Sequence, residues 1–179
     1  MLTLGTMQKR FLGWLVLMAL SLTLGMSLHR YLHWPPVPVV LRLLGLVGML
    51  LAVALLRRSG RLLRILGEPR EEWGITTRLV VTDLYTCLRH PHHLGIGLFV
   101  SSLFLAVGQW ELFLVVSLAL WTGILVFLYR VEEPELVAKF GDAYRAYRKQ
   151  VPMLLGSPLC VLRYLFRPLP TGPTGKSSP

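Results

Sequence analysis

Four apolar runs separated by short polar segments constrain this chain more than any other feature. They extend over Phe11–Leu28, Val37–Leu56, Leu94–Val107 and Leu112–Tyr129. A helix needs about 20 mainly apolar residues to cross the hydrocarbon core of a bilayer. Of all residues, 54% are hydrophobic and only 16% are charged, and the mean hydropathy is +0.57. Such values are typical of membrane proteins. We therefore expect an all-α, polytopic membrane protein with about four transmembrane helices.

The positive charges follow the ends of these runs. The net charge is +10, which in a soluble protein would suggest binding to nucleic acid. Here the basic residues flank the apolar runs, so we expect the lipid bilayer and no nucleic acid as the partner. With four spans, every lysine and arginine except Arg30 and Arg42 falls on the side that carries the termini. Cytoplasmic segments are enriched in Lys and Arg. The pattern predicts a multi-pass protein of a bacterial inner membrane or an ER-type membrane, with cytoplasmic termini. Nothing in the sequence indicates an oligomeric state.

A further helix is predicted after the last apolar run, from Pro134 to about Gln150. Its apolar residues follow the three-to-four-residue repeat of a helix, and they are Leu136, Phe140, Tyr144, Tyr147 and Val151. Basic residues lie off this stripe, so we interpret the segment as an amphipathic cytoplasmic helix that lies on the membrane surface. We expect residues 1–166 to form a single domain. Residues 167–179 are rich in Pro, Gly and Ser and are predicted to form a disordered tail.

Polar residues lie at both ends of the hairpin that the last two apolar runs are expected to form. Arg89-His90-Pro91-His92-His93 precedes the hairpin, and Glu132-Glu133 follows it. Charged groups at a membrane are costly, so they indicate a site near its cytoplasmic face. Neighbouring residues on a helix point about 100° apart. We therefore expect one carboxylate to face the pocket, while the other caps the next helix or pairs with Arg130.

The histidines of residues 90–93 could suggest a metal site, but their spacing does not favour one. The segment His90–His93 matches no standard zinc pattern, and no cysteine or carboxylate is adjacent in sequence. We therefore expect no metal, and we expect these imidazoles to form hydrogen bonds to a polar cofactor. His29 and His33 are interpreted as loop residues on the outer side.

Neither cysteine lies in a CxxC pair. A disulfide is therefore not expected. Cys87 and Cys160 also fall in segments assigned to the cytoplasmic side, where thiols stay reduced.

The segment from about Thr76 to Pro152 resembles the isoprenylcysteine carboxyl methyltransferase and phospholipid methyltransferase group of integral membrane enzymes. The pattern of that group runs roughly LVTxGxY, then RHPxYxG, a hairpin, and EExxLxxxFGxxYxxYxxxVP. This chain follows it in register over residues 79–85, 89–95 and 132–152. There are two departures, because Asp83 replaces the glycine of the first motif and His93 replaces the tyrosine of the second.

The resemblance implies S-adenosylmethionine as the cofactor, bound at the cytoplasmic ends of the last spans. The residues implied to line it are Thr77, Arg78, Leu79, Val80, Tyr85, His90, Pro91, His92, His93, Glu132 and Glu133. Implied catalytic residues are His90, Glu132 and Glu133. Carboxyl methyltransferases also use an arginine shortly before the glutamates to bind the substrate carboxylate, and Arg130 is the nearest candidate.

The leading hypothesis is methyl transfer to a lipophilic or small membrane-accessible acceptor that offers a carboxylate, an amine or a thiol. A second hypothesis is an NADPH-dependent sterol-type membrane reductase. Such enzymes share the hairpin and an RHPxYxG-like stretch but resemble this chain less after the hairpin. A third is a non-catalytic membrane protein that kept the scaffold, which the departures at Asp83 and His93 motivate.

Overall fold

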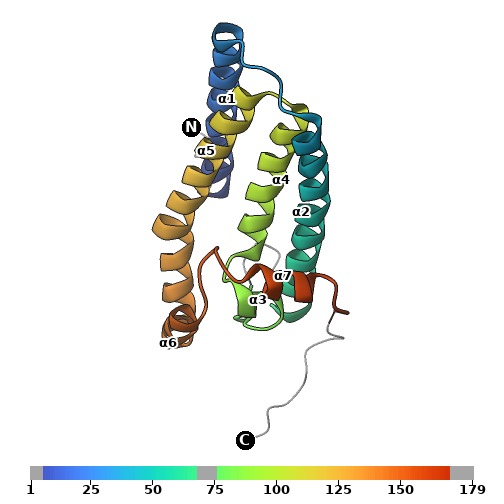
Figure 1. Ribbon diagram of the computed structural model, residues 1–179. Coiled ribbons are helices and arrows are strands. Elements are labelled where there is room, and N and C mark those ends of the chain that lie inside the picture. Colours follow the sequence, from blue (N-terminus) through green and yellow to red (C-terminus); the bar gives the residue numbers. More distant parts are fainter. Residues whose placement is uncertain (1–5, 68–75, 170–179) are drawn as a thin grey trace, which may run out of the picture. The chain divides into compact units, whose positions relative to one another are not determined.

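The computed structural model describes residues 6–67 and 76–169, and in this part of the chain every regular element is a helix (Figure 1). Three segments are long and apolar enough to cross a membrane, Arg10–Leu32, Val39–Leu66 and Trp110–Gln150. A fourth apolar helix, α4 (Pro91–Val107), is shorter. The prediction of an all-α integral membrane protein is confirmed. The number of four crossings stays a prediction.

The first two helices are longer than the apolar runs that predicted them. Helix α1 extends over Thr6–Leu32, and α2 extends over Val39–Leu66. Helix α2 continues past Leu56 because arginine and leucine are good helix formers and no proline interrupts the segment, although it contains Gly60. The first apolar run, Phe11–Leu28, ends before the helix does, because α1 continues through His29 to Leu32.

The second half of the chain contains one long helical stretch and two short helices. Its elements are α3 (Leu84–Cys87), α4, α5 (Trp110–Phe127), the π-helix η1 (Leu128–Glu132), α6 (Glu133–Gln150) and α7 (Pro158–Leu165). The predicted helix from Pro134 is present as α6, with Pro134 in its first turn as expected. It follows α5 without a break, through η1, and bends at Gly141, where φ is +56°. Its predicted position on the cytoplasmic membrane surface stays a prediction.

The chain divides into two compact units, and α2 and α4 contribute to both. One unit comprises residues 1–50 and 97–131, and the other comprises residues 51–96 and 132–179. The single domain 1–166 stays a prediction. In the first unit α1 packs along α5 (Figure 1). There α2 approaches α4 closely, because a Cβ on Gly45 would lie 2.8 Å from the backbone of Ser102 and of Ala106. Small residues at such a contact are typical of packed membrane helices.

His29 belongs to this first unit and has a partner there. Its Nδ1 lies 3.2 Å from Oε2 of Glu111, a buried residue in the first turn of α5. The backbone N–H of Trp34 donates to the other oxygen of Glu111 at 3.3 Å. Interpreting His29 as a loop residue was therefore wrong, because it lies in α1 and contacts α5. His33 does lie beyond the end of α1, with a φ of +49°.

The second unit is built around a small hydrophobic core. Its buried members come from α2, α3 and the segment before α3, and they are Leu55, Leu62, Val80, Leu84 and Tyr85. Helix α7 covers this core with Val161, Tyr164 and Leu165. The same packing joins Cys87 of α3 to Cys160 of α7 in a disulfide, with the Cα atoms 5.8 Å apart. The expectation of two free thiols was wrong, because it considered local spacing alone and not the packing of α7 on α3.

Asp83, the first departure from the family pattern, forms a buried ion pair with Arg58 of α2. Nε and Nη2 of Arg58 donate to the two carboxylate oxygens of Asp83 at 2.8 Å and 2.6 Å. Asp83 has a φ of +58°, in the range that favours glycine. Its carboxylate also accepts the backbone N–H of Leu84 at 2.8 Å and so caps α3. These contacts offset the unfavourable backbone conformation.

Arg58 also holds the start of the predicted tail. Its guanidinium donates to the backbone carbonyls of Arg167 and Pro168, and Leu169 packs against the core. Residues 167–169 are therefore part of the second unit. The remainder of the predicted disordered tail lies outside the described residues.

Candidate active site

The turn that precedes α4 is fixed by backbone hydrogen bonds from the segment after α6. The N–H of Arg89 donates to the carbonyl of Pro152 at 2.9 Å, and the N–H of His90 donates to that of Met153 at 3.1 Å. Helix α4 then begins at Pro91, earlier than the predicted apolar run Leu94–Val107, since proline suits the first helical position. His90 is 3% exposed. Its imidazole therefore has a defined position at the N-terminal end of α4.

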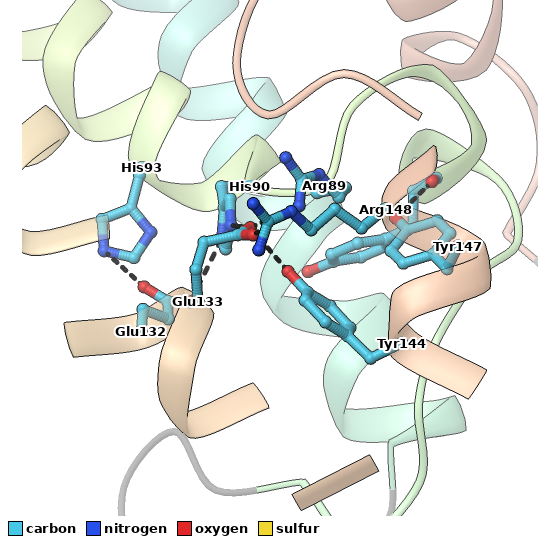
Figure 2. A network of polar contacts seen from close by, with 9 residues as sticks. Arg89, His90, His93, Glu132, Glu133, Tyr144, Tyr147 and Arg148 are labelled. Carbon is cyan, nitrogen blue, oxygen red and sulfur yellow. Dashed lines mark hydrogen bonds and ion pairs between the residues drawn. The ribbon is translucent and has the colours of Figure 1, made fainter. Parts of the chain in front are cut away.

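Both predicted glutamates contact this imidazole (Figure 2). Nδ1 of His90 lies 3.2 Å from Oε1 of Glu132, the last residue of η1. Nε2 of His90 lies 2.8 Å from Oε1 of Glu133, the first residue of α6. The predicted proximity of the histidines and the acidic pair is confirmed. We expected one carboxylate to face the pocket and the other to cap the next helix or to pair with Arg130. This expectation was wrong, because the two long side chains reach opposite edges of the same His90 ring.

Glu133 is the centre of a buried polar network. Nη1 of Arg89 donates to its two oxygens at 2.7 Å and 2.5 Å, and the hydroxyl of Tyr144 donates to Oε1 at 2.6 Å. Nε of Arg148 lies 3.6 Å from Oε2. The side chains of Arg89 and Glu133 are 8% and 6% exposed. A fully paired carboxylate of this kind holds the His90 ring in place.

Arg89, Tyr144 and Arg148 were not among the predicted site residues. The RHP motif contained the signal for Arg89, and the register of FGxxYxxY contained the signal for Tyr144. The predicted candidate Arg130 has an exposed side chain and belongs to the other compact unit. Its proposed role in binding a substrate carboxylate stays a prediction.

The aromatic stripe predicted for α6 faces this network. Tyr144 and Tyr147 are buried, and their rings form an edge-to-face pair with centroids 5.9 Å apart. The hydroxyl of Tyr147 donates to the backbone carbonyl of Tyr85 at 2.6 Å. These contacts fix α6 to α3 and so support the position of Glu133.

Glu132 is more accessible than Glu133 and is less fully paired. Its side chain is 28% exposed. Nε2 of His93, one helical turn into α4, lies 3.3 Å from its Oε2 (Figure 2). Within the described residues, Oε2 of Glu132 and Nε of Arg89 are buried polar atoms without a hydrogen-bond partner. Buried polar atoms are nearly always hydrogen-bonded, so each such exception requires an explanation.

The two carboxylates change the acid–base behaviour of His90. Burial by itself lowers the pKa of this imidazole, but the hydrogen bonds to Glu132 and Glu133 and their negative charges outweigh burial and raise the pKa above its usual value. Burial, together with the nearby Tyr147 and Glu132, raises the pKa of the Tyr85 phenol, which therefore stays neutral.

The other predicted cofactor residues have different surroundings. Nδ1 of His92 lies 3.3 Å from the hydroxyl of Ser59 on α2. The backbone N–H groups of Thr77 and Arg78 donate to the carbonyl of Gly67.

Val80 and Tyr85 belong to the hydrophobic core, Leu79 is half-buried, and Pro91 is buried at the start of α4. The structure thus brings His90, His93, Glu132 and Glu133 together. A role of the remaining residues in cofactor binding stays a prediction.

The resemblance to the isoprenylcysteine carboxyl methyltransferase group implies a helical membrane protein with a histidine–glutamate cluster at one end of a helical hairpin. The helices and the cluster described above have this arrangement. Similarity to curated proteins confirms that resemblance. The chain is 39% identical over 84 residues to protein-S-isoprenylcysteine O-methyltransferase of Schizosaccharomyces pombe, which covers 45% of this chain and 34% of the relative. It is 36% identical over 93 residues to methanethiol S-methyltransferase of Mycobacterium tuberculosis, which covers 51% of this chain and 34% of the relative. The match thus spans about a third of the length of either relative. No protein-family model matches the chain, and no solved structure does.

Proposed function

We propose that this protein is an S-adenosylmethionine-dependent methyltransferase that acts on a lipophilic or small membrane-accessible acceptor. Similarity to two proteins named as methyltransferases supports this proposal. The observation that carries it is the contact of His90 with both Glu132 and Glu133, which joins the two halves of the family pattern in one polar cluster.

The residues present fit such a cofactor. S-adenosylmethionine offers a cationic sulfonium, an α-amino group, ribose hydroxyls and a carboxylate. Nε of Arg89 is a buried donor without a hydrogen bond within the described residues, and Oε2 of Glu132 is a buried acceptor that has only the ion-pair contact with His93. A ligand with both donors and acceptors would satisfy them. When bound, the cofactor supplies an electrophilic methyl group.

The protein's own residues would position the reactants and manage a proton. Glu132 would bind positive groups of the cofactor, since a partly desolvated carboxylate attracts a cation more strongly than one in water. Glu133, held by Arg89 and Tyr144, would keep the His90 ring oriented. Alignment of two bound reactants can supply about 7–11 kcal/mol of barrier reduction. For such a reaction, positioning matters more than covalent participation of the protein.

The need for a base depends on the acceptor. A carboxylate acceptor is ionised at neutral pH and needs none. For a thiol or an amine, His90 or a glutamate would take the proton; because the two carboxylates raise the pKa of His90, its imidazole serves as a base only in the neutral form. The names of the two relatives indicate an O-methylation in one and an S-methylation in the other. Both acceptor types are therefore included in the proposal. A cytoplasmic position of the site is part of the proposal as well, and the distribution of basic residues supports it.

Incubation with methyl-labelled S-adenosylmethionine and a total membrane extract tests the activity. We expect label in an extractable product with the wild-type protein and at least about tenfold less with Glu132→Gln. No transfer above a protein-free control, from any extract fraction, would contradict the proposal. Thermal stabilisation by NADPH instead of S-adenosylhomocysteine would favour the reductase hypothesis.

A further inference from the structure

We propose that His90, His93 and Glu132 form a binding site for a divalent first-row cation of the zinc type. Each residue offers one ligand atom, and these atoms all lie within 4.8 Å of one another. The cluster combines two imidazoles with one carboxylate, a ligand set that zinc sites use. The inference goes beyond the proposed function, and only its last step, competition with the cofactor, rests on that function.

The spacing of the cluster is close to that of a bound ion. Oε1 of Glu132 lies 3.2 Å from Nδ1 of His90, and Oε2 lies 3.3 Å from Nε2 of His93. Two ligands of a tetrahedral zinc ion, each about 2.1 Å from the metal, are about 3.4 Å apart. Glu132 therefore stands at ligand distance from both imidazoles, through a different oxygen to each, and a small side-chain shift would bring the three ligand atoms, now within 4.8 Å of one another, around one ion. Three protein ligands leave a fourth position open to solvent or to another ligand.

The partner of the other His90 nitrogen strengthens this interpretation. Nε2 faces Glu133 at 2.8 Å, and Glu133 is itself held by Arg89 and Tyr144. A carboxylate behind a ligating imidazole fixes the tautomer of that imidazole. In the metal-free protein a protonated His90 donates to both carboxylates, and a metal ion bound at Nδ1 would replace the proton between His90 and Glu132.

The proposed site depends on His93, a residue in which this chain departs from the family pattern. It replaces the tyrosine of the family pattern, and in this structure it is the residue that approaches the second oxygen of Glu132. In the sequence, no carboxylate lies next to these histidines, and on that ground no metal was expected. The fold, however, brings a carboxylate from the end of η1 to the start of α4. The third histidine, His92, contacts Ser59 and is not part of the cluster.

Occupation by a cation would affect the proposed methyltransferase reaction. A metal ion on Glu132 neutralises the carboxylate that is proposed to bind the positive groups of the cofactor. Metal and cofactor would then compete for one carboxylate. The cation would act as an inhibitor in this site, and the His93→Tyr variant, which restores the family residue, would be insensitive to it.

Calorimetric titration of the detergent-solubilised full chain, first stripped with EDTA, tests the site with ZnCl2 as the probe. We expect one zinc ion per wild-type chain, and at least about tenfold weaker binding by His93→Tyr and by Glu132→Gln. His92→Gln is the matched control and should bind zinc like the wild type. Equal zinc affinity in the wild type and both cluster variants, no zinc binding by the wild type, or an equal loss in His92→Gln would each overturn the site.

A second titration with S-adenosylhomocysteine separates the two proposals. We expect saturating zinc to weaken its binding to the wild type at least about tenfold and to leave His93→Tyr unchanged. Zinc binding without any S-adenosylhomocysteine binding would reject the proposed function and keep the metal site. Binding of S-adenosylhomocysteine that zinc does not affect would reject the competition.

Discussion

Nε2 of His90 lies 2.8 Å from Oε1 of Glu133, and this contact joins the turn before α4 to the first residue of α6. The two residues are 43 positions apart in sequence. Glu133 is in turn neutralised by Arg89, so the contact is part of a buried, charge-balanced network. Glu132, next to it, keeps one oxygen without a hydrogen bond within the described residues. The adjacent carboxylates therefore have different surroundings, and we propose that Glu133 is structural while Glu132 binds a ligand.

Glu133→Gln should strongly destabilise the protein. The substitution leaves the buried Arg89 guanidinium without its counter-charge, and removal of one partner of a buried ion pair costs about 3–5 kcal/mol. Equilibrium unfolding in mixed micelles measures the free energy of unfolding. Glu132→Gln is the control, since this side chain is more exposed and its loss should cost about 1 kcal/mol. Equal losses in the two variants would contradict the division of roles.

The pH dependence of stability should show the contribution of His90. Its pKa in the folded protein is raised above the unfolded value of about 6.5. Protonated His90 therefore stabilises the folded state fully below about pH 6.5, and this contribution is lost as the pH rises through the folded pKa. The difference in unfolding free energy between wild type and His90→Gln, measured in EDTA, should shrink from pH 6 to pH 9. A difference that grows over this range would contradict the assignment. The charged or titratable groups that surround the His90 imidazole are Glu132, Glu133, Arg89 and His93.

Asp83→Gly restores the family residue but should still destabilise the fold. It relieves a backbone conformation that costs about 1–3 kcal/mol. It also leaves buried Arg58 unpaired, which costs about 3–5 kcal/mol. We expect a net loss of about 2 kcal/mol by equilibrium unfolding, and recovery of part of it when Arg58→Met is added. A double variant less stable than Asp83→Gly would show that Arg58 acts through other contacts.

The disulfide between Cys87 and Cys160 can be tested chemically. Mass spectrometry of the denatured, non-reduced protein after treatment with iodoacetamide should show no alkylation, and prior reduction should allow both cysteines to react. Cys160→Ser should lower the free energy of unfolding by about 2–4 kcal/mol, because the crosslink restricts the unfolded chain. Full alkylation without reduction would contradict the pairing.

The helical membrane fold and the proximity of His90 to the two glutamates could be predicted from the sequence, for identifiable reasons. The apolar runs made the spans visible, and a helical hairpin necessarily brings residues before Pro91 near residues after Tyr129. The motif register identified His90 and the glutamates. Pro134 at the start of α6 was also recognisable, since its missing N–H matches the first helical turn.

What the sequence could not show depended on tertiary packing. Helix α7 lies on α3 and brings two distant cysteines together, which local spacing cannot reveal. Arg58 and Asp83 pair only because α2 continues beyond its apolar run. The pairing of Glu133 with Arg89 was also not predictable. The π-helical turn η1 ends just before Glu133, and a simple helical repeat does not predict side-chain directions around such a turn.

Calorimetric titration of S-adenosylhomocysteine into the metal-free protein tests the central claim most directly. The account predicts one site per chain in the wild type and at least about tenfold weaker binding by Glu132→Gln, with the two proteins of similar stability. Absence of binding to the folded wild type, or equal affinity in the wild type and Glu132→Gln, would contradict it.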